Sequence, residues 1–402
     1  MGFSKISLGA NSLLLVVAVL ATEVQGLNTF DVRKYGAKAD GKTEDTQAIM
    51  KAWKDACAST TPSTVVIPRG KYSVGPLMLL GPCKAKSIAI NLQGILQAPS
   101  DLNKHKSQDG WIVFQYIDGL TVFGGGTFDG QGSVAWAVND CAKTGKCNSL
   151  PINIRFNFIT NSLVQGVTSL DSKQFHVNVL GCNNLTFDHF TITAPGESLN
   201  TDGIHIGRSI GINITNSNIK TGDDCISIGD GSKQIRITGV NCGPGHGISV
   251  GSLGKYPNEE PVEGVFVKNC TLTGTQNGVR IKTWPDSHQG VASDMHFEDI
   301  IMNNVGFPVL IDQEYCPWNQ CKQSIPSRIQ LSKISFSKIR GTSSTAEAVK
   351  LVCSKGVPCQ NVEISDINLK YTGPQGRAKS ICKNVKPTVK GQQVPTACSA
   401  TA

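Results

Sequence analysis

Pairs of aliphatic residues that flank a single polar residue recur along the middle of the chain at a constant step. The pairs are 22 residues apart: Ile204/Ile206, Ile226/Ile228 and Ile248/Val250. A fixed period of this size, with one short alternating segment in each copy, is typical of a solenoid in which every repeat adds a strand. The aliphatic residues are expected to face the core and the residue between them to face outward. We therefore predict an all-β fold, a single-stranded parallel β-solenoid.

The same kind of short β-rich run, bounded by Gly, Pro and Asn, extends over most of the chain. The runs begin at residues 65–67 and continue to residues 362–364, and nothing between them resembles a linker. We expect one domain over residues 27–402, with an irregular polar tail from about residue 372. Alternating strand and helix units are absent, which argues against a Rossmann or TIM fold.

An amphipathic segment precedes the β-rich runs. Its apolar stripe consists of Ile49, Ala52, Trp53 and Ala56 at helical spacing. Thr43 is in a position to cap this segment, with two acidic residues following in the first turn. We predict a short N-terminal helix that covers the open first coil of the solenoid.

Ionisable residues occupy equivalent positions in the repeats. Asp202, Asp224 and His246 are also 22 residues apart, and Asp223 directly precedes Asp224. Strict alternation would put these side chains in the core, so we place them at the bend before each strand, where adjacent glycines free the backbone. Equivalent residues of successive coils lie about 4.8 Å apart. The acids and the imidazole are therefore expected to form one column.

The residues between the aliphatic positions are expected to point out of the core beside this column. They are His205, Ser227, Ser249 and Arg280, and Lys282 has the parity of Arg280. Carboxylates this close raise one another's pKa, so that one of them tends to hold a proton in mildly acidic solution. A protonated acid beside an ionised carboxylate is what glycoside hydrolysis requires. The two cations are suited to hold a carboxylate of the substrate.

The beginning of the chain has the pattern of a secretory signal peptide. Lys5 is followed by an apolar run at residues 13–20 and a small-residue cleavage pattern at residues 24–26, and the run is too short to cross a bilayer. We expect a signal peptide over residues 1–26 and a secreted, extracellular product that binds no membrane. The net charge of +8 either aids solubility or indicates an anionic partner, for which nucleic acid, acidic polysaccharide and lipid headgroups all qualify.

The chain has 14 cysteines, all after the signal peptide, and an even number in an oxidising compartment favours disulfides. We expect the pairs Cys57–Cys83, Cys141–Cys147, Cys225–Cys242, Cys316–Cys321, Cys353–Cys359 and Cys382–Cys398, which leaves Cys182 and Cys270 as buried thiols. No C-x-x-C pair occurs, so a zinc site is not expected. N-glycosylation acceptors occur at Asn184, Asn213 and Asn269.

Four short motifs resemble the signatures of the polygalacturonases, family 28 of the glycoside hydrolases. They are Asn200-Thr201-Asp202, Gly222-Asp223-Asp224, Gly245-His246-Gly247 and Arg280-Ile281-Lys282. The resemblance covers nearly the whole mature chain and is strongest to the plant pollen-type branch, which includes enzymes that release monogalacturonate from chain ends. One departure is Leu199, which stands where the family usually has proline.

This resemblance implies a right-handed parallel β-helix that hydrolyses α-1,4 bonds of polygalacturonate with inversion and with no metal or other cofactor. By motif position, Asp223 would be the general acid, Asp202 and Asp224 would activate water, and His246 would support the acid. The substrate-binding residues would be Asn200, Arg280 and Lys282, with Tyr315 as a weaker match. The partner would be an acidic polysaccharide of the cell wall and not nucleic acid, and the protein would act as a monomer.

Three alternatives remain at this point. Exo action is favoured, but endo action depends on loops whose closure a sequence does not show. A pectate lyase would share the fold and the substrate, but its β-elimination uses Ca²⁺ and a basic residue. A non-catalytic pectin-binding wall protein would keep the basic groove, although the intact acid, base and cation motifs argue against it.

Overall fold

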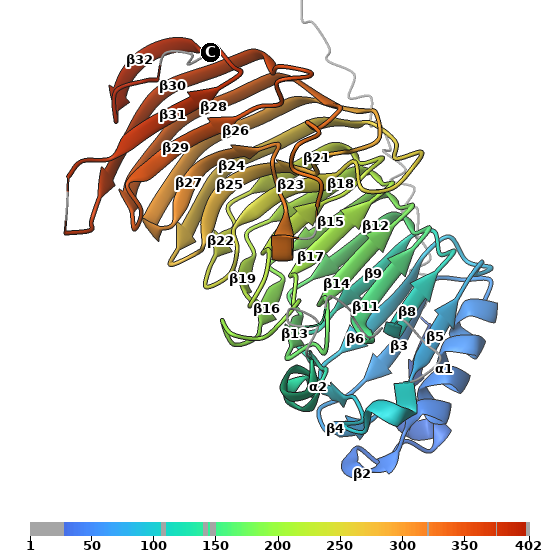
Figure 1. The fold of residues 1–402 in the computed structure, drawn as a ribbon. Helices are drawn as coiled ribbons and strands as arrows, with labels where there is room; N and C mark the ends of the chain where they lie inside the picture. The colour runs from blue at the N-terminus through green and yellow to red at the C-terminus, as the bar shows by residue number, and fades with distance from the viewer. Residues whose placement is uncertain are drawn as a thin grey trace, which may run out of the picture.

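The computed structural model describes residues 28–105, 110–139, 144, 150–319, 321–374 and 376–398. The predicted signal peptide and the predicted Cys141–Cys147 pair lie outside these residues. The chain forms a right-handed parallel β-helix whose coils stack along one axis, from α1 at one end to β32 at the other (Figure 1). Right-handed crossovers are the rule for parallel strands in one sheet. Among the described residues, no helix is both long and apolar enough to cross a membrane.

One sheet of 11 strands gains a strand from each coil after the first. Its strands are β5 (Leu77–Leu80), β8 (Gly110–Gln115), β11 (Ile152–Asn157), β14 (Val177–Leu180), β17 (Ile204–Gly207), β20 (Ile226–Ile228), β23 (Ile248–Leu253), β25 (Asn277–Thr283), β27 (Phe307–Asp312), β29 (Glu347–Val352) and β31 (Lys379–Lys383).

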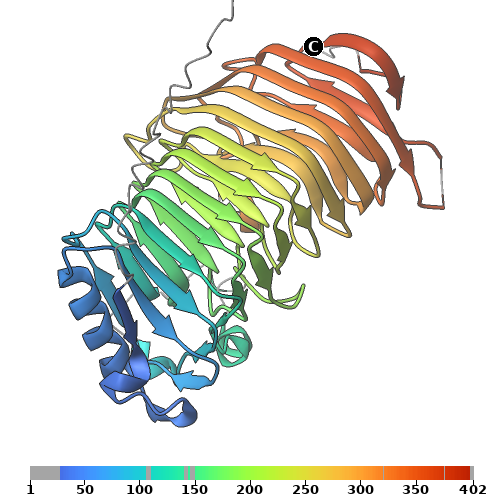
Figure 2. The same ribbon diagram turned by 180° about the vertical axis from the view of Figure 1, so that it is seen from behind.

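The other walls of the coils belong to one continuous sheet of 21 strands. Its strands are β1 (Asn28–Asp31), β2 (Asp40–Glu44), β3 (Ser63–Ile67), β4 (Lys71–Ser73), β6 (Ile88–Leu92), β7 (Ile95–Gln97), β9 (Leu120–Phe123), β10 (Thr127–Asp129), β12 (Thr160–Gln165), β13 (Thr168–Leu170), β15 (Asn183–Asp188), β16 (Thr191–Thr193), β18 (Ile210–Thr215), β19 (Asn218–Lys220), β21 (Lys233–Thr238), β22 (Asn241–Cys242), β24 (Val262–Thr273), β26 (Gly290–Val305), β28 (Ile329–Ser343), β30 (Gln360–Tyr371) and β32 (Thr388–Val394). Strands β24, β26, β28 and β30 are long, and β24 pairs with both β21 and β22, so that one strand continues where earlier coils have two (Figure 2).

The register in the 11-stranded sheet confirms the predicted repeat. Ile204 pairs with Ile226, which pairs with Ile248, and the next partner is Val279, after the longer insertion. The six aliphatic residues that defined the period are all 0% exposed. Burying each of them stabilises the fold by about 1.5–3 kcal/mol. Aromatic residues stack between coils in the same way, as in Phe114 and Phe156, whose ring centroids are 5.1 Å apart.

Helix α1 (Thr46–Ala58) covers the N-terminal end of the core, as predicted. Its buried face includes the predicted stripe, and Trp53 Nε1 donates to the Leu80 carbonyl at 3.1 Å. The predicted start was wrong, because Thr43 lies in β2, where its hydroxyl donates to Asp40. Asp45 is the N-cap residue, but its carboxylate accepts the backbone N–H groups of Lys38 and Ala39 instead of capping the helix.

The remaining helical segments are short. Helix α2 spans Ser133–Val138, and the 3-10 helices η1, η2 and η3 span Val32–Tyr35, Leu102–His105 and Pro317–Asn319.

The polar C-terminal segment is more regular than predicted. Strands β31 and β32 continue the two sheets where we expected an irregular tail from about residue 372. The prediction of an irregular tail rested on polar composition, but these strands form the last coil, where a polar composition is compatible with a strand. Most of the side chains of β32 are exposed to solvent, so polar residues cost nothing there.

Five predicted disulfides are confirmed. They are Cys57–Cys83, Cys225–Cys242, Cys316–Cys321, Cys353–Cys359 and Cys382–Cys398. Cys182 and Cys270 are buried thiols, as expected, and burial raises the pKa of each to about 11. Of the three glycosylation acceptors, Asn184 and Asn269 are exposed and Asn213 is half-buried.

Candidate active site

A cleft of about 820 Å³ runs over the outer face of the 11-stranded sheet at its middle coils. Six of the residues that line it were predicted as site residues: Asn200, Asp223, His246, Arg280, Lys282 and Tyr315. The other two predicted residues, Asp202 and Asp224, are only 6% and 1% exposed. The structure therefore brings all eight of the predicted catalytic and substrate-binding residues together.

The bends that carry the catalytic candidates lie directly before three successive strands. Asp202 precedes β17, Asp224 precedes β20 and His246 precedes β23, as the repeat predicted. The coils are joined at these bends by backbone bonds, including one from His246 N to the Asp223 carbonyl at 2.7 Å. Glycine is required here: Gly247 has a φ of +92°, and a Cβ at this position would lie 2.2 Å from the Asn277 carbonyl oxygen.

Asp224 is buried but fully paired. Its Oδ1 accepts from Ser249 Oγ and from Arg280 Nη2, both at 2.8 Å, and its Oδ2 accepts from Lys282 Nζ at 2.7 Å. Burial alone would raise the pKa of Asp224, but the charges of Lys282 and Arg280 outweigh it and lower the pKa to about 2. Asp224 is therefore a carboxylate throughout the range in which proteins normally work.

Asp202 has the opposite environment. Burial raises its pKa well above the ordinary value, and the negative charges of Asp223 and Asp224 raise it further. The charge of Lys282 and a 2.8 Å hydrogen bond donated by Ser227 Oγ oppose this shift without cancelling it. Two carboxylates on neighbouring coils thus have pKa values shifted in opposite directions, which is the pattern of a site for acid–base chemistry.

Asp223 is the acid that reaches the open cleft. Its side chain is 24% exposed, and His246 Nδ1 lies 2.9 Å from its Oδ1. Ligating atoms of Asp223, Asp224 and His246 all lie within 4.8 Å of one another. Three such groups resemble a metal site, but the ammonium of Lys282 and the guanidinium of Arg280 already bind Asp224. Their positive charges oppose a divalent cation at this position.

Tyr315 lines the cleft beside the two cations. Its ring lies 5.2 Å from Lys282 Nζ and 5.9 Å from the Arg280 guanidinium carbon, within cation–π range. The ring also meets Trp284 edge to face at 5.6 Å. The structure therefore places Tyr315, the weakest of the sequence matches, in the cleft beside the two cations.

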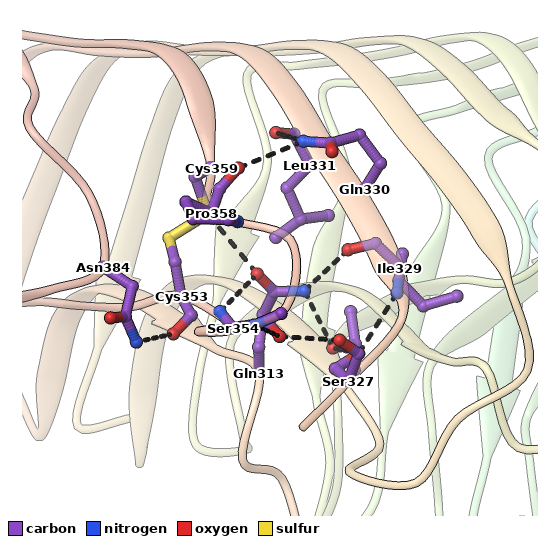
Figure 3. The surroundings of a disulfide bond; sticks show 12 residues. Gln313, Ser327, Ile329, Gln330, Leu331, Cys353, Ser354, Pro358, Cys359 and Asn384 are labelled. Atoms are coloured by element: carbon purple, nitrogen blue, oxygen red, sulfur yellow. Dashed lines mark hydrogen bonds between the residues drawn. A yellow bond between two sulfur atoms is a disulfide. The ribbon is translucent and has the colours of Figure 1, made fainter. Parts of the chain in front are cut away.

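The loop that carries Tyr315 is anchored by Gln313, at the end of β27 (Figure 3). Gln313 Nε2 donates to the Ile329 carbonyl at 2.8 Å, and its Oε1 accepts from Ser354 N at 2.9 Å. The Cys353–Cys359 disulfide lies beside this network, and Cys316–Cys321 staples the loop itself. These bonds hold the aromatic side of the cleft in place.

The residues of the first motif have different positions: Asn200 lines the cleft, whereas Thr201 is buried in the scaffold. Asn200 is exposed and adopts a φ of +58°, and Leu199 beside it also lines the cleft. Thr201 is buried, and its Oγ1 accepts from Gly222 N at 2.9 Å, so this residue joins the first motif to the second.

Sequence reasoning missed other residues that contact the site. Ser227 and Ser249 were expected to point outward, and they do, but each donates to a buried carboxylate. Lys350 lines the cleft two strands beyond Arg280, in the same register column. Its outward parity in residues 349–351 is a signal that could have identified it.

This chain belongs to the glycosyl hydrolases family 28, whose family model matches residues 57–398. It is 61% identical over 360 residues to an exopolygalacturonase of Oenothera organensis, covering 89% of this chain and 99% of the relative. An exopolygalacturonase of Platanus acerifolia is 56% identical over 368 residues, which is 92% of this chain and 97% of that relative. Among solved structures, a polygalacturonase from Erwinia carotovora ssp. carotovora superposes with a TM-score of 0.69 at 25% identity, over 86% of this chain and 94% of that one.

Proposed function

We propose that this protein is a polygalacturonase, which hydrolyses the α-1,4 bonds of polygalacturonate and releases galacturonate from chain ends. The observation that carries the proposal is the column of three carboxylates set beside two cations, in which the pKa of Asp202 is raised and that of Asp224 is lowered. A glycosidase needs a proton donor for the leaving oxygen and a carboxylate for water. The names of the relatives with 61% and 56% identity support the substrate and the exo mode.

In the proposed mechanism, Asp223 is the general acid. It is the one of the three acids that lines the open cleft, where a glycosidic oxygen can reach it. His246, 2.9 Å away, orients its carboxyl group. Asp202 and Asp224 together activate the attacking water, Asp224 as a permanent carboxylate and Asp202 as the group whose ionisation depends on pH.

The proposed contacts to the substrate carboxylate are made by the two cations, Arg280 and Lys282. Arg280 and Lys282 stand beside Asp224 and also line the cleft, so a galacturonate carboxylate can approach them from the open side. Asn200 and Tyr315 line the same cleft and would contribute further contacts to the sugar. A net charge of +8 favours an acidic polysaccharide over a neutral one.

Exo action is supported by the position of Asn139. This residue follows α2, which belongs to an early coil, and it lines the cleft together with Glu197. We infer that these side chains narrow the path of a chain that would continue toward the N-terminal coils. We propose that the signal peptide, residues 1–26, is removed on secretion. The mature protein then acts as a monomer outside the cell, on the pectin of the cell wall.

The test of the proposal is the chemical nature of the products. De-esterified polygalacturonate is incubated with the protein in the presence of a chelator. Saturated galacturonate should appear, without the ultraviolet absorbance of an unsaturated sugar. Unsaturated products that require Ca²⁺ would instead identify a lyase, and no products from a well-folded protein would identify a binding protein.

A further inference from the structure

Two of the three acids in the catalytic column, Asp202 and Asp224, receive the same contact from the following coil. Ser227 Oγ donates to Asp202 Oδ2, and Ser249 Oγ donates to Asp224 Oδ1, each at 2.8 Å. In both pairs the serine lies 25 residues after the aspartate, and the two serines are register partners in β20 and β23. The repeat therefore builds one serine–carboxylate bond per coil.

The groups behind the two serines differ in charge. Ser249 Oγ accepts from the Arg280 guanidinium, Nε to Oγ, at 3.0 Å. Ser227 Oγ lies 2.8 Å from Nδ1 of His205, its register partner on the preceding strand. A serine hydroxyl has a single proton. When Ser227 gives that proton to ionised Asp202, the imidazole must donate from Nδ1.

His205 is a neutral imidazole at any pH well above 4. Burial lowers its pKa to about 4, and the positive charge of Lys282 acts in the same direction. Arg155 also lowers the pKa, whereas Asp224 and Asp230 oppose the shift. The ring of Phe175, 5.3 Å away, covers one side of the imidazole. His205 can therefore donate one hydrogen bond without adding a charge beside Asp202.

We propose that His205 and Ser227 are positioning residues for Asp202, forming a chain from His205 Nδ1–H through the Ser227 hydroxyl to the carboxylate. The chain orients Asp202 and favours its ionised form, because hydrogen bonds donated to a carboxylate stabilise the charged state. The charged groups that face Asp202 are Asp223, Asp224 and Lys282. Lys282 is shared with Asp224, so Ser227 is the donor that serves Asp202 alone. This inference rests on the proposed hydrolase function.

The test is the pH dependence of kcat/KM on de-esterified polygalacturonate. A base that must be ionised sets the acid limb of this profile. Ser227→Ala and His205→Phe should each move the acid limb upward by about one pH unit, the size expected for loss of a hydrogen bond to a charged group. Ser227→Thr and His205→Asn keep the respective donors and should restore the limb.

Ser232→Ala is the matched control. Ser232 is also buried, but its hydroxyl donates to a backbone carbonyl, that of Ile206, at 3.3 Å and not to a carboxylate. The acid limb of the kcat/KM profile of Ser232→Ala should match that of the wild type. If Ser227→Ala and His205→Phe lower the rate equally at every pH and leave the limb in place, the pair is merely structural and the inference fails.

A second readout does not depend on activity, and so separates this inference from the proposed function. In protein with ¹⁵N-labelled histidine, the ring nitrogen shifts of His205 should show a neutral Nδ1–H tautomer above the acid limb. An Nε2–H tautomer there would reverse the chain and overturn the inference, whether or not the protein cleaves polygalacturonate.

Discussion

Asp224 and Lys282 are 58 residues apart in the sequence, yet Oδ2 of one lies 2.7 Å from Nζ of the other, and both side chains are buried. Arg280 adds a second cation at 2.8 Å. Among the described residues, no cation forms an ion pair with Asp202, one coil earlier. This asymmetry divides the site into one carboxylate that is always charged and one whose charge is costly, and it has consequences for stability.

Asp202→Asn should stabilise the protein at pH 7. Because the pKa of Asp202 is raised in the folded state, wild-type stability falls as the pH rises from the unfolded pKa, about 4, through the folded pKa. The variant does not undergo this loss, so it should be more stable than the wild type at pH 7 and equally stable at or below pH 4. The measurement is the denaturant midpoint at both pH values, and a loss of stability at pH 7 would contradict it.

Asp224→Asn is the matched control and should do the reverse. It removes the carboxylate charge to which Arg280 and Lys282 are bonded, and breaking a buried pair in this way costs about 3–5 kcal/mol. The folded pKa of Asp224 is lowered to about 2, so its stabilising contribution is present above the unfolded pKa. That contribution disappears as the pH falls from about 4 through about 2. Two variants that shift stability in the same direction at pH 7 would disprove the asymmetry.

The disulfide beside the catalytic bend offers a separate test. Cys225 directly follows Asp224 and is bonded to Cys242, four residues before His246. Replacing both cysteines with alanine should lower the free energy of unfolding by about 3 kcal/mol in the chain-entropy model. Activity should fall more than in a double alanine variant of Cys382 and Cys398, because that disulfide closes a loop of similar length but lies at β31, five strands from β20 in the same sheet. Equal activity in the two variants would show that the bond does not position the bend.

The product profile distinguishes exo from endo action. We expect monomeric galacturonate from the first minutes of reaction, with a slow fall in viscosity, because Asn139 and Glu197 line one end of the cleft. Early mixed oligomers with a rapid viscosity drop would keep the hydrolytic chemistry but establish an endo enzyme.

Product stereochemistry tests the role of the third acid. Oxygens of Asp223 and Asp224 lie within 4.8 Å, closer than the separation of about 6.5–9.5 Å usual for an inverting pair. We nevertheless expect inversion, because Asp202 supplies a third carboxylate for the water. Proton NMR during early turnover should therefore show the β-anomer forming first from the α-linked substrate. Initial release of the α-anomer would indicate a covalent intermediate.

The sequence predicted the repeat and the column because both depend on period alone. The aliphatic positions of β17, β20 and β23 set the register, and the register fixes which bends are neighbours. The bonds of Lys282 and Arg280 to Asp224 were not predictable, because parity says that a side chain points outward but not which group it reaches. Tyr315 escaped the pattern since it lies in a non-repeating loop anchored by Gln313.

The most direct test of the central claim is the turnover of Asp223→Asn on de-esterified polygalacturonate. Asparagine keeps the shape of the side chain but has no acidic proton to transfer to the leaving oxygen. The proposed mechanism predicts a fall in kcat of about 10²–10⁴-fold, the range of general acid catalysis, with an unchanged unfolding midpoint. A variant that folds normally and releases galacturonate at the wild-type rate would contradict the assignment of Asp223 as the acid.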